Sequence, residues 1–205
     1  MAETARALSA DPALLDQRIF LRGVTWDDYE RLLVLRGDDP GLRMTCLEGE
    51  LELMSPSKHH QRLKKRWARL LEAWSEEVGI DLEGIGSWTI RNQLQERGLE
   101  PDECYFVGGH KPAAATPDVA LEVLWTSGGL DKLAVYAGLG VREVWFWKDG
   151  RISFHALRDG AYKEIARSEL LSEFDPGLVG PLVNAASSQA EAVRALRAAL
   201  RSSKS

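Results

Sequence analysis

The clearest fold signal in the chain is the stretch PDVALEVLWTSGGLDKLAVYAGLGVREVWFW, residues 117–147. Its first part, PDVALEVLW, is rich in valine and leucine and predicts a buried strand. The middle part, GGLDKLAVYAGLG, predicts a short helix that ends at a glycine. The last part, VREVWFW, predicts a second strand with Trp145 and Trp147 on one face and Val144 and Phe146 on the other, mostly in the core. A strand, a helix and a strand in this order indicate a sheet with helices packed on it.

Upstream, the sequence predicts two helices and a hairpin. TWDDYERLLVLRG, residues 25–37, predicts a helix with Thr25 as its N-cap and Gly37 near its end. The alternating segment MTCLEGELELMSP, residues 44–56, predicts strands that turn at Glu48-Gly49, with the glutamates on a solvated face. KHHQRLKKRWARLLEAWSEEVG, residues 58–79, predicts a long amphipathic helix because its leucines and tryptophans recur every three or four residues.

Further strands are predicted at SWTIRNQL, residues 87–94, and PDECYFV, residues 101–107, followed by a meander at residues 151–165. The fold class is therefore α/β (α+β), with a mixed central sheet flanked by helices. We expect one domain over residues 1–205, with its core at about 25–170. The remaining predictions are a loose arm or short helix at residues 1–20 and a C-terminal amphipathic helix at 188–203.

Composition restricts the class of protein. The chain has 205 residues, of which 44% are hydrophobic and 28% charged, as is ordinary for a globular protein. No apolar run is long enough to span a bilayer, and the N-terminus does not resemble a secretory signal. With only Cys46 and Cys104, a disulfide framework is not expected, and a reducing cytoplasm fits best. The net charge of −5 argues against broad nonspecific nucleic-acid binding, although the basic residues 58–69 form either a solvated helix face or a local phosphate-binding face.

Asp118 and Glu122 are unexpected in a buried strand, because a buried carboxylate costs several kcal/mol unless something compensates its charge. The candidates are a solvated sheet end, a salt bridge or a cation. The two acids are roughly 13 Å apart along a strand, too far to share one metal ion directly. Asp118 follows a proline, where aspartate is often a turn former. If residues 101–107 pair with residues 117–123, however, Asp102 stands beside Glu122, and the two carboxylates converge on one Mg²⁺.

The predicted helix after this strand offers two further candidates. Lys132 and Tyr136 are four residues apart and so lie on one helix face. A helix that packs back onto its own sheet could bring Lys132 to the same site, where it would orient a water or stabilise charge on a phosphate. A Glu122–Lys132 salt bridge without metal is the competing interpretation, and Lys132 alone is more often a surface lysine.

The same residues resemble a known family. The segments EPDECYFVGG and TPDVALEV, then K-x-x-x-Y and G-V-x-E-x-W, are similar to the Uma-two family, whose members are classed as restriction endonucleases in the PD-(D/E)XK superfamily. The resemblance runs from about Thr25 to Leu170. It implies a restriction-endonuclease-like fold with Asp102 and Glu122 as catalytic metal ligands. The superfamily's lysine position is Leu124 here, and the resemblance implies that Lys132 replaces it.

The resemblance also implies supporting residues. EGELELMSPSKHHQ resembles the family's first hairpin and helix start, and His60 matches the family histidine, as a general base or phosphate contact or as a capping or packing residue. Thr45 stands near a position where the family often has an acid. Glu48 or Glu50 could support the metal instead, although a solvated strand face is the simpler interpretation.

Together these observations predict an endonuclease that hydrolyses phosphodiester bonds in DNA with Mg²⁺ or Mn²⁺. The resemblance and symmetry imply a homodimer, because two strands need two sites. One alternative is a catalytically inactive binding or scaffold protein that kept the fold. Another is a metal-dependent hydrolase of small phosphodiesters.

Overall fold

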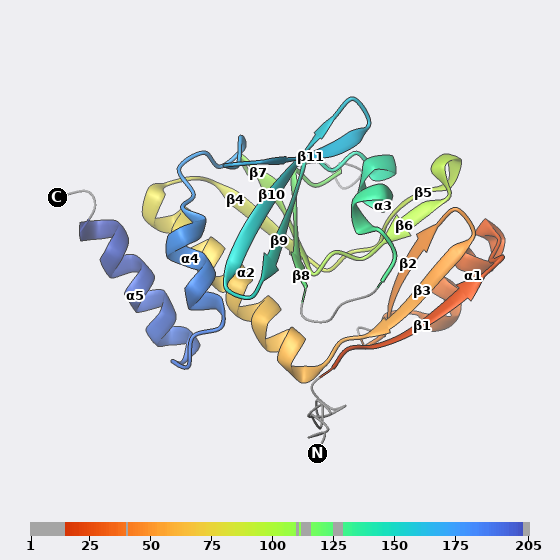
Figure 1. Cartoon of the computed structure of the whole chain (residues 1–205), viewed down its shortest axis with the longest axis horizontal. Coiled ribbons are helices and arrows are strands. Elements are labelled where there is room, and N and C mark those ends of the chain that lie inside the picture. The colour runs from red at the N-terminus through yellow and green to blue at the C-terminus, as the bar shows by residue number, and fades with distance from the viewer. Residues whose placement is uncertain (1–14, 40, 110, 112–115, 125–128, 203–205) are drawn as a thin grey trace, which may run out of the picture.

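The computed structural model describes residues 15–39, 41–109, 111, 116–124 and 129–202. Its strands form two sheets that lie beside each other (Figure 1). One helix, α3 (Lys132–Leu139), packs between the sheets, and the other helices lie on their outer faces. This confirms the predicted α/β (α+β) class with a mixed sheet flanked by helices, which is consistent with a restriction-endonuclease-like fold. The second, antiparallel sheet was not predicted. Among the described residues, no helix combines the length and apolar composition that a membrane crossing requires.

The mixed sheet has six strands in the order β11-β10-β9-β8-β7-β4. β8 and β9 run parallel, as a strand–helix–strand unit requires, and the other neighbours are antiparallel. The predicted meander is the β9–β10–β11 part of this sheet. The strands are β4 (Leu82–Gly86), β7 (Glu103–Val107), β8 (Val119–Val123), β9 (Glu143–Lys148), β10 (Arg151–Arg158) and β11 (Ala161–Ile165).

The antiparallel sheet has five strands in the order β1-β3-β2-β6-β5. β2 and β3 form the predicted hairpin, and its turn residues Glu48 and Gly49 have φ of 46° and 87°. Positive φ at both positions fits a tight hairpin turn, for which glycine is well suited. The strands are β1 (Gln17–Arg22), β2 (Arg43–Leu47), β3 (Glu50–Ser55), β5 (Ile90–Asn92) and β6 (Arg97–Leu99), with a 3-10 turn, η2 (Gln93–Gln95), between the last two.

Three apolar clusters hold these layers together. The largest packs one face of the mixed sheet, including Trp145 and Trp147, against α2, α4 and α5. A second packs the opposite face, including Val144 and Phe146, against α3. A third joins α1 to β2 and β3. The helices are α1 (Trp26–Arg36), α2 (Lys58–Val78), α3 (Lys132–Leu139), α4 (Pro176–Val183) and α5 (Gln189–Ser202).

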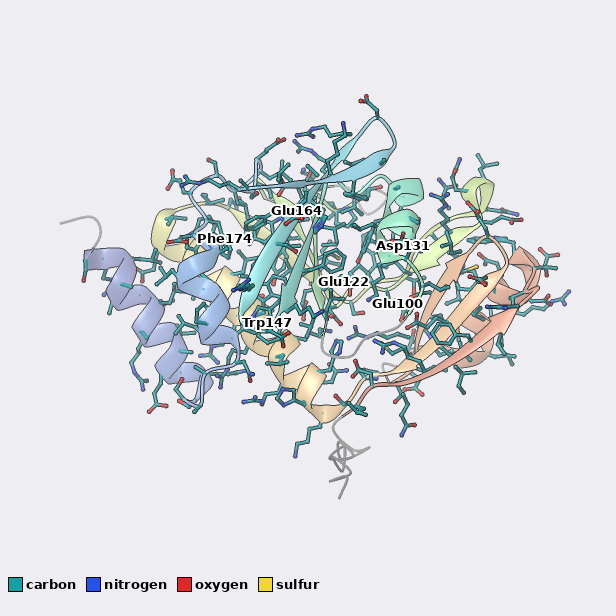
Figure 2. All side chains as sticks on the ribbon, in the orientation of Figure 1. Glu100, Glu122, Asp131, Trp147, Glu164 and Phe174 are labelled. Atoms are coloured by element: carbon teal, nitrogen blue, oxygen red, sulfur yellow. The ribbon has the colours of Figure 1, made fainter. Side chains whose placement is uncertain are left out.

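The predicted helix ends agree with the structure. Thr25 caps α1 in a reciprocal pair with Asp28, whose backbone N lies 3.2 Å from the Thr25 hydroxyl. Gly79 ends α2 and Gly140 ends α3, both in the left-handed conformation that glycine adopts without strain. Figure 2 shows Trp147 on the side of the mixed sheet that faces α2 and α4, and Glu122 nearer the antiparallel sheet.

Three predictions need correction, and three short elements were not predicted. The loose arm is wrong from Gln17 onward, because β1 pairs with β3 over six residues; residues 1–14 lie outside the described residues. The strand predicted at residues 87–94 covers only Ile90–Asn92. β4, β6 and α4 were not predicted, because they are short or rich in glycine. The basic face of α2 is only partly solvated: Arg66 is buried and donates to the carbonyl oxygens of Ala185 and Ser187.

The packing of α2 predicts a clear difference between two leucines. Leu70 is fully buried in the largest cluster, whereas Leu94 in η2 is 94% exposed. Leu70→Ala should lower the free energy of unfolding by about 2–5 kcal/mol, because it leaves a cavity. Leu94→Ala should change it by less than about 0.5 kcal/mol. Urea denaturation of both variants checks this, and equal losses would contradict the assigned position of α2.

Candidate active site

Asp102 and Glu122 face each other across two paired strands. β7 and β8 are antiparallel with Glu103 opposite Leu121, so the next residues on each strand, Asp102 and Glu122, stand opposite each other. The backbone N of Val123 donates to Asp102 Oδ2 at 2.7 Å, which fixes this register. The predicted juxtaposition of the two acids is therefore what the structure shows. Both side chains are almost completely buried, with 1% and 0% of their surface exposed.

Asp102 is held by two cationic groups besides the Val123 amide. Arg43 from β2 forms an ion pair with Asp102 Oδ1, and His60 Nε2 lies 2.8 Å from the same oxygen. Burial alone would raise the pKa of Asp102, but Arg43 and His60 outweigh it and hold that pKa well below its usual value. Asp102 is therefore an ionised carboxylate at neutral pH.

Glu122 has a different environment. Lys132, the first residue of α3, forms an ion pair with Glu122 Oε2, and the Tyr136 hydroxyl donates to Oε1 at 2.6 Å. Burial raises the pKa of Glu122, and the nearby Asp102 charge adds to this, whereas Lys132 and Tyr136 oppose it. The pKa of Tyr136 is raised well above its usual value by burial and by Glu122, so its hydroxyl stays a donor. The predicted convergence of Lys132 and Tyr136 on Glu122 is present, and so is the salt bridge of the competing interpretation.

His60 connects Asp102 to a second buried acid. Its Nδ1 lies 2.9 Å from Asp16 Oδ2, and its Nε2 contacts Asp102. Burial lowers the pKa of His60, but Asp102 and Asp16 together raise it to about 9, so the imidazole is protonated at neutral pH and donates to both carboxylates. The Ser57 hydroxyl caps α2 by accepting from the backbone N of His60 at 3.1 Å. The cap orients the first turn of α2 so that His60 points toward the acids.

Further contacts connect Asp16, through Arg18 and Glu52, to the backbone just before α3. Arg18 from β1 lies 3.5 Å from Asp16 and donates its Nε to Glu52 at 2.9 Å. Glu52 in turn accepts from the backbone N of Leu130 at 2.8 Å, two residues before Lys132. We call this series the charge ring. The backbone from Leu130 to Lys132, and from Glu122 to Val123, whose amide donates to Asp102, completes its circuit. The charge ring contains four acids and four cationic groups: Asp16, Glu52, Asp102, Glu122, Arg18, Arg43, His60 and Lys132.

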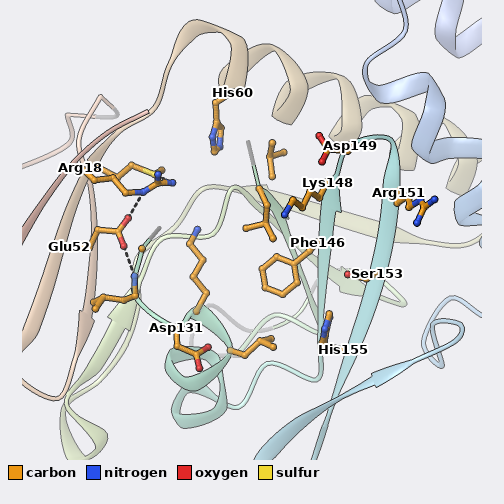
Figure 3. Close-up of a pocket in the computed structure, with 17 residues that line it drawn as sticks. Arg18, Glu52, His60, Asp131, Phe146, Lys148, Asp149, Arg151, Ser153 and His155 are labelled. Atoms are coloured by element: carbon orange, nitrogen blue, oxygen red, sulfur yellow. Dashed lines mark hydrogen bonds and ion pairs between the residues drawn. The ribbon is translucent and has the colours of Figure 1, made fainter. Parts of the chain in front are cut away.

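The charge ring borders a pocket of about 800 Å³ between the two sheets (Figure 3). Arg18, Glu52, His60 and Lys132 line one part of it. The opposite part comes from β9 and β10, on which Figure 3 labels Phe146, Lys148, Arg151, Ser153 and His155. A small ligand could therefore reach the groups that contact the buried acids.

Two other predicted positions, Glu50 and Asp118, lie elsewhere. Glu50 begins β3, at the end away from His60, and pairs with Arg22 at 3.3 Å. Asp118 is held by Lys111, Arg142 and the backbone N of Val107, so a structural role as a strand-end anchor accounts for its burial. Leu124 is 37% exposed and lines the pocket. Because position 124 is a leucine, the lysine that contacts Glu122 is Lys132 of α3.

Sequence reasoning missed Arg43, Asp16, Arg18 and the burial of Glu52. Glu52 was expected on a solvated face with Glu48 and Glu50, but β1 and the backbone before α3 cover it. Arg43 and Arg18 belong to the antiparallel sheet and reach the acids only in the folded chain. The one available signal was the alternation in QRIFLR, residues 17–22, which is weak.

The carboxylates of Asp102 and Glu122 have oxygen lone pairs that a divalent cation could use. An ionised carboxylate offers about four acceptor positions. Asp102 uses three of them and Glu122 two, so both retain lone pairs. Among the described residues no group of three His, Cys, Asp or Glu side chains could hold a metal. Mg²⁺ often takes only one or two carboxylates and fills its other positions with waters and phosphate oxygens, so a pair of carboxylates is compatible with the chemistry of this ion.

The family comparison agrees with this geometry. Residues 26–183 match the model of the Uma2 family, described as "Putative restriction endonuclease". The chain belongs to the Uma2 family. The match includes β7, β8, α3 and β9, and therefore every element that supplies Asp102, Glu122 and Lys132. No match was found among curated proteins.

The charge ring predicts that stability falls at alkaline pH. The pKa of His60 is about 9 in the folded chain against an ordinary value of 6.5. The raised value means that its contribution is complete below pH 6.5 and is lost as the pH rises through 9. We expect the free energy of unfolding to fall by about 3 kcal/mol over this interval.

Urea denaturation at pH 6, 7, 8 and 9 measures this loss. His60→Gln, which cannot be protonated, should be less stable at pH 6 and should lack most of the pH dependence. If wild type and His60→Gln lose stability equally over this interval, His60 does not carry the effect.

Proposed function

We propose that this Uma2 protein is a metal-dependent endonuclease that hydrolyses phosphodiester bonds in DNA. The observation that carries the proposal is the Asp102–Glu122 pair with Lys132 at its edge, beside a pocket that can admit a phosphate. Asp102 and Glu122 would hold a Mg²⁺ or Mn²⁺ ion. Such an ion, when bound, polarises a phosphate oxygen and lowers the pKa of a bound water.

The residues of the chain have distinct roles in this proposal. Asp102 supplies a carboxylate kept ionised by Arg43 and His60. Lys132 lines the pocket while it contacts Glu122, so its ammonium lies where charge on a phosphate can be stabilised. Tyr136 fixes the orientation of Glu122, and Asp16 fixes that of His60. Tyr136, Asp16 and His60 are positioning residues.

Two observations favour a second candidate, an inactive binding protein that kept the nuclease fold. Glu122 already has Lys132 as a compensating charge, and the superfamily's usual lysine position holds the apolar Leu124. A buried ion pair of this kind is sufficient to explain Glu122 without any metal. The two candidates differ in what Glu122→Gln does to metal binding.

The nuclease candidate predicts separable losses at two positions. Glu122→Gln should abolish Mg²⁺ binding in calorimetry, because it removes a charged ligand. Lys132→Ala should retain metal binding but lower the rate of plasmid cleavage by about 10²–10³-fold, because it removes a charge from the phosphate site. Circular dichroism checks that both variants are folded.

Glu164→Gln, on the exposed part of β11, is the matched control, and we expect wild-type metal binding and cleavage from it. Glu50→Gln should also behave as wild type, because Glu50 lies in an ion pair at the far end of β3. Wild-type metal affinity in Glu122→Gln, with a loss of stability alone, would reject the nuclease and favour the inactive protein.

The charge ring also predicts that metal binding depends on an anion. Its four acids and four cationic groups already balance, so a bare divalent cation adds uncompensated charge. We expect weak Mg²⁺ affinity for the protein alone and at least tenfold tighter binding when thymidine 5′-monophosphate is present, after correction for the nucleotide's own Mg²⁺ binding. Calorimetric titrations with and without the nucleotide test this; equal affinities would show that the ring does not control metal binding.

A further inference from the structure

We propose that the sheet surface beside Glu122 binds an unpaired nucleotide of the substrate strand. We call this surface the nucleotide strip, and it consists of Phe146, Lys148, Arg151, Ser153 and His155. The inference rests on the proposed nuclease function and specifies its substrate class, a single-stranded or locally unpaired segment of DNA.

The strand register places the nucleotide strip directly next to the acids. In the parallel pair of β8 and β9, Glu122 stands beside Phe146, and Phe146 stands beside Ser153 of β10. Neighbouring strands are about 4.8 Å apart, so these three residues form one row on one face of the sheet. The row two residues further along contains Lys148 opposite Arg151. A DNA strand that runs from the acids across this face of the sheet meets Phe146 and Ser153 first, and Lys148 and Arg151 next.

The two cations of the nucleotide strip are available to a ligand. Lys148 and Arg151 are exposed and form no ion pair within the part of the chain that the structure describes. In contrast, Lys132 and Arg18, which also line the pocket, contact Glu122 and Glu52. Asp149 lies in the same turn, so the turn keeps one net positive charge. Unpaired cations one row further along the sheet from the acids are suited to bind the phosphates that flank the cleaved bond.

The surface between the cations and the acids suits a base. Phe146 and Leu124 give the pocket an apolar wall. The His155 ring packs edge-on against Phe146, with centroids 5.3 Å apart at 82°. His155 Nδ1 is buried and has no hydrogen-bond partner among the described residues. His155 lines the pocket, so a rotation of its ring would offer this nitrogen to a base edge, which carries both donors and acceptors.

Burial of the acids explains why the nucleotide must be unpaired. With Asp102 and Glu122 only 1% and 0% exposed, a phosphate on the surface of an intact duplex does not reach them. The pocket beside them is lined by their partners His60 and Lys132 and has about 800 Å³, within the range of about 300–1,000 Å³ for small-molecule sites. That space admits a nucleotide but not a duplex with its second strand. Enzymes that act on groups hidden in a duplex use single strands or extract the nucleotide.

The test measures binding of fluorescent 12-nucleotide single-stranded and duplex DNA to the whole chain in EDTA, which prevents cleavage. Anisotropy is followed from 50 to 200 mM salt. Wild type should bind the single strand at least tenfold more tightly than the duplex. Lys148→Ala/Arg151→Ala should lower single-strand affinity at least tenfold and reduce the salt slope by about 1.4, or about 0.7 per lost phosphate contact. The Lys163→Ala/Arg194→Ala variant removes the same charge from exposed positions on β11 and α5 and should bind as wild type.

A charge-neutral variant tests the pocket itself. Ser153→Trp places a large side chain on the half-buried Ser153 position and should lower single-strand affinity without changing the salt slope. Equal loss in the two double variants, or duplex binding as tight as single-strand binding, would overturn the inference.

Cleavage assays with Mg²⁺ separate this inference from the proposed function. Strip-dependent binding of single strands without cleavage of any DNA would reject the nuclease and keep the nucleotide strip. Cleavage by wild type that is unchanged in Lys148→Ala/Arg151→Ala would keep the nuclease and reject the nucleotide strip.

Discussion

The need to compensate buried charge constrains this molecule more than any other interaction. Four acids and four cationic groups meet between the two sheets, and each depends on a partner from another element. A charge left without its partner in such a place typically costs about 3–5 kcal/mol. The antiparallel sheet therefore cannot shift relative to the mixed sheet without breaking contacts of Asp16, Arg43 or Glu52. The relative position of the sheets and the geometry of the candidate active site are consequences of the same contacts.

The two central acids differ because their partners differ. Asp102, with a guanidinium, an imidazolium and a backbone amide, is driven toward ionisation, whereas the pKa of Glu122 is raised by burial. Environments that separate the pKa values of two neighbouring acids are typical of functional sites. The lysine that contacts Glu122 comes from α3, and not from the strand that carries Glu122. Leu124, just after that strand, therefore forms an apolar part of the pocket wall.

The sequence was most informative where local patterns and local contacts coincide. β7, β8, α3 and β9 follow one another along the chain, and their apolar strand patterns and the terminal glycine of the helix are local signals. Asp102, Glu122, Lys132 and Tyr136 could therefore be brought together from the sequence. Arg43 and Asp16 could not, because nothing in their neighbourhoods distinguishes them from surface residues, and their partners are more than forty positions away. Glu52 shows the limit of alternation: the pattern gives its face of the strand, but only tertiary packing decides whether that face meets water.

The closed path of the charge ring also affects when the site can exist. Its members extend from Asp16 to Lys132, and β8 is completed only by pairing with β9, which ends at Lys148. Contacts of such long sequence separation form late, because loop closure must precede them. A chain still emerging from the ribosome would therefore lack the assembled acids until most of it had been synthesised. In the proposed nuclease, hydrolytic competence would then coincide with completed folding, and a partly folded chain would pose little danger to the nucleic acid around it.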